Sequence, residues 1–154
     1  MIHSIDMKGQ RGVLLLESLI AILLFSIGIL AVVGLQANAI KNVTQSKYRS
    51  DAAFLADQLV GQMWADRTNI AAYAYTSGAG AGNLAPWIAQ VAALPLAATY
   101  PPQVSVTATA MVGPPTYTNY QVSVTVRWQL PEEFNATPRP APHSHTTTAT
   151  IPCC

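Results

Sequence analysis

The chain has 154 residues, of which 51% are hydrophobic and 10% are charged, and its formal net charge is +1. Its length suits one ordinary domain and is too short for two beside a membrane span. A near-neutral balance without a basic cluster gives no electrostatic footprint for nucleic acid, so we predict no nucleic-acid partner.

The first element is an apolar run from Val13 to Leu35 in which Glu17 is the only charged residue. A helix rises about 1.5 Å per residue, so this run can cross a hydrocarbon core of about 30 Å, and we predict a transmembrane helix. An acid in such a span costs about 2.5 to 3.5 kcal/mol on insertion scales and normally marks function. The alternative is a plain single-pass anchor that tolerates an acid near the cytoplasmic interface.

The residues before the run set its orientation. Lys8 and Arg11 lie close to the membrane, and positive charge there holds the N-terminus in the cytoplasm, so the rest of the chain is predicted across the membrane. A secretory signal peptide would carry a small-residue cleavage site after the apolar run. No A-x-A pattern stands near Gly34, so we predict that the run is retained.

Beyond the run the helix period continues to about Arg67, where Thr68 and Asn69 offer a stop. The apolar positions, mostly three or four apart, predict a stripe that faces a core: Ile40, Val43, Tyr48, Ala52, Leu55, Ala56, Leu59, Val60, Met63 and Trp64. Glycine and proline then predict a loop from Tyr73 to Pro102, with a short helix from Pro86 to Leu94.

From Gln103 the apolar period changes to two, which predicts half-buried strands. The predicted strands are Gln103 to Ala110, Tyr120 to Trp128 and, after a proline-rich break, Ser144 to Ile151. The turn signal at residues 113–115 predicts that the first two form a hairpin. An antiparallel sheet packed on the helical stripe gives an α+β domain.

Few side chains suggest chemistry. His143, His145, Cys153 and Cys154 form the only cluster with metal-ligand chemistry, but their spacing matches no zinc pattern, so we predict surface histidines and neither metal nor cofactor. The cysteines are adjacent and have three alternatives: a vicinal disulfide, a bridge to another chain, or free thiols.

The remaining candidates are structural. Glu132 and Glu133 are adjacent rather than converging, which predicts a solvated turn and no acid/base pair. Trp64, Trp87 and Trp128 are predicted to be core or interface anchors. No serine has a nucleophile context and no glycine-rich loop is placed to hold phosphate, so we predict that the chain is not an enzyme.

The N-terminus resembles a known signal. Arg11 and Gly12 followed by Val13-Leu14-Leu15-Leu16-Glu17 resemble the class III signal of type IV pilins, in which prepilin peptidase cuts after the glycine and methylates the new first residue. The resemblance implies leader cleavage between Gly12 and Val13 and N-methylation of Val13. It also implies that Glu17 acts in subunit assembly by meeting the Val13 amine of a neighbouring subunit.

Two segments further along the helix, Gly34 to Ile40 and Ala56 to Arg67, are similar to minor pilins of the PilV type. The resemblance implies the type IV pilin fold, with a leader at 1–12, a transmembrane or filament-core half-helix at 13–35, and a periplasmic globular domain at 36–154. It implies a minor pilin stored in the inner membrane and then incorporated into the pilus or its assembly-priming complex, supporting twitching motility and adhesion.

The partners that the resemblance implies are prepilin peptidase, other minor and major pilins, inner-membrane lipid and a tip adhesin. Two alternatives stay open. The first is a minor pseudopilin of a type II secretion system, because that class shares the N-terminal signal. The second is an unprocessed single-pass protein whose periplasmic sheet holds a ligand.

Overall fold

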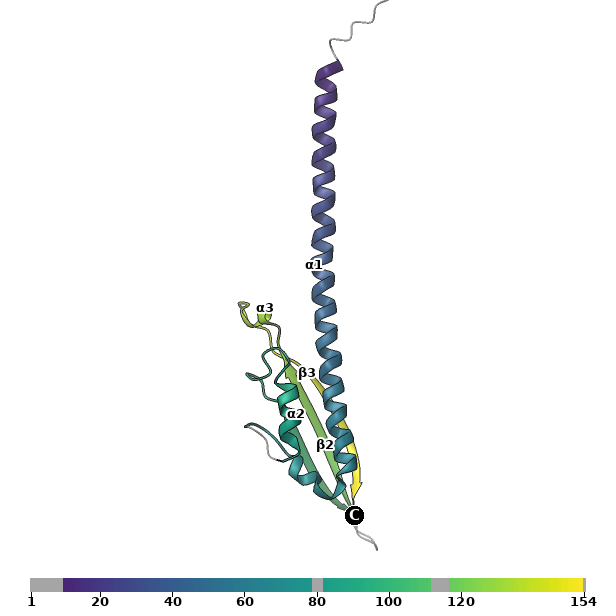
Figure 1. The fold of residues 1–154 in the computed structure, drawn as a ribbon, viewed down its shortest axis with the longest axis vertical. Helices are drawn as coiled ribbons and strands as arrows, with labels where there is room; N and C mark the ends of the chain where they lie inside the picture. Colours follow the sequence, from purple (N-terminus) through teal and green to yellow (C-terminus); the bar gives the residue numbers. More distant parts are fainter. Residues whose placement is uncertain (1–9, 79–81, 112–116, 154) are drawn as a thin grey trace, which may run out of the picture. The chain divides into compact units, whose positions relative to one another are not determined.

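A computed structural model describes residues 10–78, 82–111 and 117–153, and the chain divides into two compact units, Met1–Thr44 and Gln45–Cys154. Figure 1 shows the elements coloured in chain order and labels α1, α2, α3, β2 and β3. They are α1 (Gln10–Ala65), η1 (Arg67–Tyr73), α2 (Leu84–Val91), β1 (Gln103–Met111), β2 (Tyr117–Trp128), α3 (Pro131–Phe134) and β3 (His143–Cys153).

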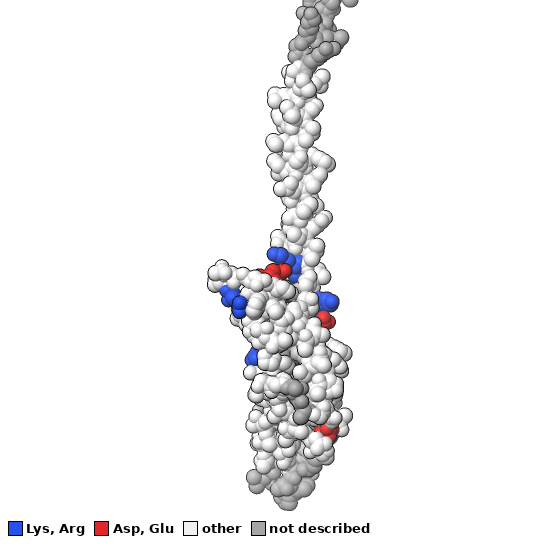
Figure 2. All heavy atoms as spheres, turned by 60° about the vertical axis from the view of Figure 1, so that its left-hand side comes forward, with Lys and Arg blue, Asp and Glu red and all other residues white. Residues whose placement is uncertain are grey.

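The first unit contains the apolar part of α1. Its large hydrophobic side chains are exposed all round the helix, and Figure 2 shows the visible face of this stretch without a charged side chain. Water would not favour so much exposed apolar surface, whereas lipid or neighbouring helices would. By length and composition, this one helix near the N-terminus could span a membrane, as the sequence predicts.

In the second unit, α1 is amphipathic. The buried side chains of Ala52, Leu55, Ala56, Leu59 and Met63 recur at intervals of three or four residues and enter one hydrophobic core. The predicted stripe is therefore confirmed in this part of the helix. It does not extend back to Ile40 and Val43, which belong to the first unit and are exposed.

The three strands form one antiparallel sheet in the order β1-β2-β3. Side chains alternate between its faces, so Val104, Val122, Val124, Val126 and Ile151 are buried on the inner face. The predicted α+β architecture, a long N-terminal helix on a small antiparallel sheet, is confirmed. The turn predicted at residues 113–115 lies outside the described residues.

The predicted short helix is also present, as α2. Its Trp87 is buried and its indole Nε1–H donates a hydrogen bond of 2.7 Å to the carbonyl oxygen of Leu55 on α1. A buried indole needs such a partner. The bond fixes α2 on the same stripe of α1 that packs on the sheet.

The tryptophans do not all reach the core. Trp87 and Trp128 are buried, as predicted, but Trp64 is 39% exposed and therefore is not a core residue. The Arg67 guanidinium lies 5.1 Å from the centre of the Trp64 ring, within cation–π range. An interface role for Trp64 stays a prediction.

Candidate functional site

The polar side chains of the apolar run Val13 to Leu35 are Glu17, Ser18 and Ser26. Ser18 donates to the carbonyl oxygen of Leu14 at 2.8 Å, and Ser26 donates to that of Ile22 at 2.7 Å. These bonds satisfy both hydroxyl donors inside the helix, as an apolar environment requires. Glu17 is exposed and has no hydrogen bond or ion pair among the described residues. It is thus the polar side chain of the run for which the described residues supply no partner.

The residues around this carboxylate lie at the start of α1. Gly12 and Val13 belong to its first turns, since the helix begins at Gln10. Lys8 lies outside the described residues, and the side chain of Arg11 is not described either. Leader cleavage, methylation of Val13 and the positive-inside orientation therefore stay predictions.

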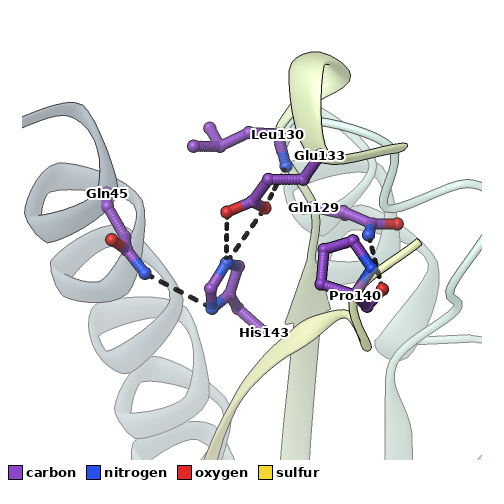
Figure 3. Close-up of polar contacts among 6 residues, drawn as sticks. All are labelled: Gln45, Gln129, Leu130, Glu133, Pro140 and His143. Atoms are coloured by element: carbon purple, nitrogen blue, oxygen red, sulfur yellow. Dashed lines mark hydrogen bonds and ion pairs between the residues drawn. The ribbon is translucent and has the colours of Figure 1, made fainter. Parts of the chain in front are cut away.

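The second unit holds a polar cluster, which we call the His143 cluster: Gln45, Trp128, Glu133 and His143. Figure 3 shows Gln45 and Glu133 on either side of the His143 ring. The Nε2 atom of His143 lies 3.0 Å from both carboxylate oxygens of Glu133. The Nδ1 atom lies 3.5 Å from the amide nitrogen of Gln45. The imidazole is stacked on the Trp128 ring with 5.7 Å between centroids.

This geometry selects one tautomer of His143. A carboxylate accepts hydrogen bonds, so Nε2 carries the proton that faces Glu133. Nδ1 of the neutral ring is then an acceptor, and it faces the donating amide nitrogen of Gln45. Both ring nitrogens are occupied, which leaves neither available as a general base or metal ligand. The cluster therefore acts as a clamp between α1, α3 and β3.

Glu133 has a second role that the sequence analysis missed. Its carboxylate also accepts the backbone N–H of Leu130 at 3.2 Å, which caps the start of α3 (Figure 3). The interpretation of Glu133 as part of a solvated turn is therefore wrong, while Glu132 is exposed. Pro131 followed by a glutamate at the third helical position is a helix-start signal that could have found this cap.

The proline-rich break is held at both ends. Gln129 is fully buried and its amide Nε2 donates to the carbonyl oxygen of Pro140 at 2.9 Å (Figure 3). The next residue, Leu130, donates its backbone N–H to Glu133 and closes the turn of α3. The segment between β2 and β3 thus keeps a defined course without forming a strand.

A second polar group lies where α1 ends. Asp66 accepts hydrogen bonds from Asn69 at 2.7 Å, from the Tyr73 hydroxyl at 3.2 Å and from Asn83 at 3.4 Å. These residues line a hollow of about 270 Å³. Three of the roughly four acceptor positions of the carboxylate are already used by the protein, so the group stabilises the turn into η1. Burial raises the pKa of Tyr73, and the neighbouring Asp66 charge adds to the shift.

The C-terminal candidates are also defined in part. Cys153 is disulfide-bonded, so the free-thiol alternative is wrong for this residue, and Cys154 lies outside the described residues. The Cys153 sulfur lies 3.0 Å from the carbonyl oxygen of Arg67. His145 is 3.3 Å from the hydroxyl of Thr147. In the described part of the chain, no three His, Cys, Asp or Glu side chains form a group that could hold a metal ion.

Comparison with known proteins gives no match to a family model, to a curated protein or to a solved structure.

The two adjacent glutamates allow a matched test of the His143 cluster. Glu133→Ala should lower the free energy of unfolding by about 1 to 2 kcal/mol, because it removes the cap of α3 and the hydrogen bond from His143 together. Glu132→Ala should change it by less than about 0.5 kcal/mol, since its side chain is exposed. Urea unfolding of the full chain in detergent measures both. Equal losses in the two variants would show that the cluster is not a clamp.

The Tyr73 pKa predicts a pH dependence. Because the folded-state pKa lies above the usual value of 10.0, the contribution of Tyr73 is complete below pH 10.0 and is lost as the pH rises through the folded pKa. The wild-type chain should therefore lose more stability above pH 10.0 than Tyr73→Phe does. Unfolding across this range measures the difference, with the exposed Tyr117→Phe as control. Identical pH profiles for wild type and Tyr73→Phe would contradict the burial of the phenol.

Proposed function

We propose that this chain is a minor pilin of the type IV pilus, incorporated through α1 into the pilus or its assembly-priming complex. The observation that carries the proposal is the Glu17 carboxylate, which has no partner among the described residues and lies in the apolar run Val13 to Leu35, where both serines are satisfied within the helix. The resemblance of Arg11 to Glu17 to the pilin signal supports it. The α+β fold is the one that such a resemblance implies.

The physical reason is the cost of an unpaired charge in an apolar environment. A carboxylate alone in the span is costly, and a pair removed from water together costs less than a stranded charge. Cleavage between Gly12 and Val13 would create a positive amine, and Glu17 would become the fifth residue of the mature helix. The partner for Glu17 is then the amine of a neighbouring subunit.

The proposal includes a location. Lys8 and Arg11 favour a cytoplasmic N-terminus, which puts the Gln45–Cys154 unit in the periplasm before assembly. The partners are prepilin peptidase, lipid of the inner membrane and other pilins. The chain supports assembly, twitching motility and adhesion as a structural subunit.

The pilin proposal first predicts how the N-terminus is processed. The native protein should begin at Val13 and carry one additional methyl group on its N-terminal amine, because the peptidase both cuts and methylates. Mass spectrometry of protein purified from its own cells measures both changes. Gly12→Val should give a chain that keeps its leader. Native protein that begins at Met1 would overturn the proposal.

The pilin proposal also predicts that Glu17 is needed for assembly. Glu17→Gln should insert in the membrane as the wild type does, but its amount in sheared filaments or in isolated priming complexes should fall at least about tenfold, a factor that corresponds to about 1.4 kcal/mol. Ser26→Ala is the matched control in the same run, because its hydroxyl bonds only within the helix. Quantitative immunoblots of membrane and assembled fractions measure the ratio. Normal incorporation of Glu17→Gln would refute the role of the carboxylate.

A further inference from the structure

The outer face of the sheet, which points away from the core, is lined by hydroxyl and amide side chains. The strand registers bring them into rows across all three strands, directly opposite one another. One row is Ser105, Ser123 and Thr148, and the next is Thr107, Gln121 and Thr150. The residues of these rows are exposed, except that Ser123 is half-buried.

Neighbouring hydroxyls on this face are close enough to act together. The Thr125 and Thr146 hydroxyl oxygens lie 3.0 Å apart, and either can be the donor. A hydroxyl offers one donor and two acceptor positions, so such a pair keeps unused capacity toward a ligand. The hydroxyl groups of a sugar have the same dual character, and each row can therefore exchange hydrogen bonds with them in both directions.

The charge of the face restricts its partner. Apart from two histidines, Arg127 is the only Asp, Glu, Lys or Arg side chain of β1 and β2 and of β3 as far as Pro152, and its guanidinium already donates to Gln103 at 2.6 Å. An anionic polymer would need several free cations, and a lipid surface would need basic or apolar groups. Protein interfaces are enriched in aromatic residues and Arg and depleted in Ser. The neutral hydroxyl face complements an uncharged partner rich in hydroxyl groups.

The size of the face favours a polymer over a single sugar. From Gln103 to Thr109 the strand covers about 20 Å, and the three strands cover about 10 Å across, by the usual strand spacings. Sites for small ligands are concave, whereas this surface is the open side of a sheet. Tyr117, 52% exposed, lies on the same face by strand alternation and offers a ring on which a sugar can stack.

We propose that the outer face of the sheet binds an extended, uncharged polysaccharide. The proposal goes beyond pilus assembly and does not depend on it, because it uses only residues of β1, β2 and β3. It gives the second unit a ligand of its own.

The test is binding of the full chain in detergent to insoluble cellulose and chitin, two uncharged polysaccharides, at low and high salt. Ser123→Asp places a carboxylate at the centre of the face, where a neutral ligand would strand it without a partner. Thr148→Asp introduces a carboxylate at an exposed position of β3 on the same face. It replaces Ser123→Asp in the test if circular dichroism shows that Ser123→Asp misfolds. Ser77→Asp is the matched control, an exposed serine outside the sheet.

We expect retention of the wild type on at least one of the polymers with little effect of salt. Either sheet variant should weaken it at least about tenfold, and Ser77→Asp should leave it within about twofold, because only the sheet variants bury a charge against the ligand. No retention on either polymer would overturn the proposal. Retention that high salt abolishes, or that all three variants reduce equally, would overturn it too. Processing at Val13 is measured in a separate experiment. A failure of polysaccharide binding would therefore overturn only the present proposal and would leave the pilin proposal standing.

Discussion

One apolar stripe on α1 holds the Gln45–Cys154 unit together. Leu55, Leu59 and Met63 enter the same core as the inner valines of the sheet, and Trp87 of α2 bonds to the backbone of Leu55. Each fully buried side chain of this kind contributes about 1.5 to 3 kcal/mol. Because strand side chains alternate, burying one face of β2 on this stripe determines which residues point outward. A register slip of one residue would bury Ser123 and expose Val122 and Val124.

Much of this arrangement could be predicted from the sequence because it has a period. The apolar repeat of three to four residues and the alternation after Gln103 both arise because one side of each element is buried and the other faces solvent. Such patterns involve only residues close together in the sequence. The pairing of Glu133 with His143 has no such signature. The two residues are ten positions apart across a proline-rich segment, and their contact depends on the course that Gln129 and Pro140 impose. The 39% exposure of Trp64 likewise depends on where the edge of the core falls.

For Glu17, sequence and structure are both required to show that the carboxylate lacks a partner among the described residues. The sequence places one acid in the apolar run, but it does not tell whether the neighbouring serines could satisfy it. The structure directs both serine hydroxyls to backbone carbonyls one turn earlier, so they are committed within the helix. A polar group in lipid that its own chain does not satisfy must find a partner or neutralise. A charged Glu17 in lipid would therefore need such a partner, and the proposed assembly would supply one through the amine of a neighbouring subunit.

The hydroxyl face of the sheet has a competing explanation, since threonine is favoured in any strand. Strand propensity accounts for the many threonines, but not for the missing charges. Soluble sheets commonly carry lysine on exposed strands, which keeps edges from pairing with other chains. Here the outer residues of β3 from Ser144 to Thr150 include none, and Arg127 of β2 is already bonded to Gln103. A face that lacks these lysines but keeps its hydroxyls exposed is better explained by a neutral ligand than by strand stability alone.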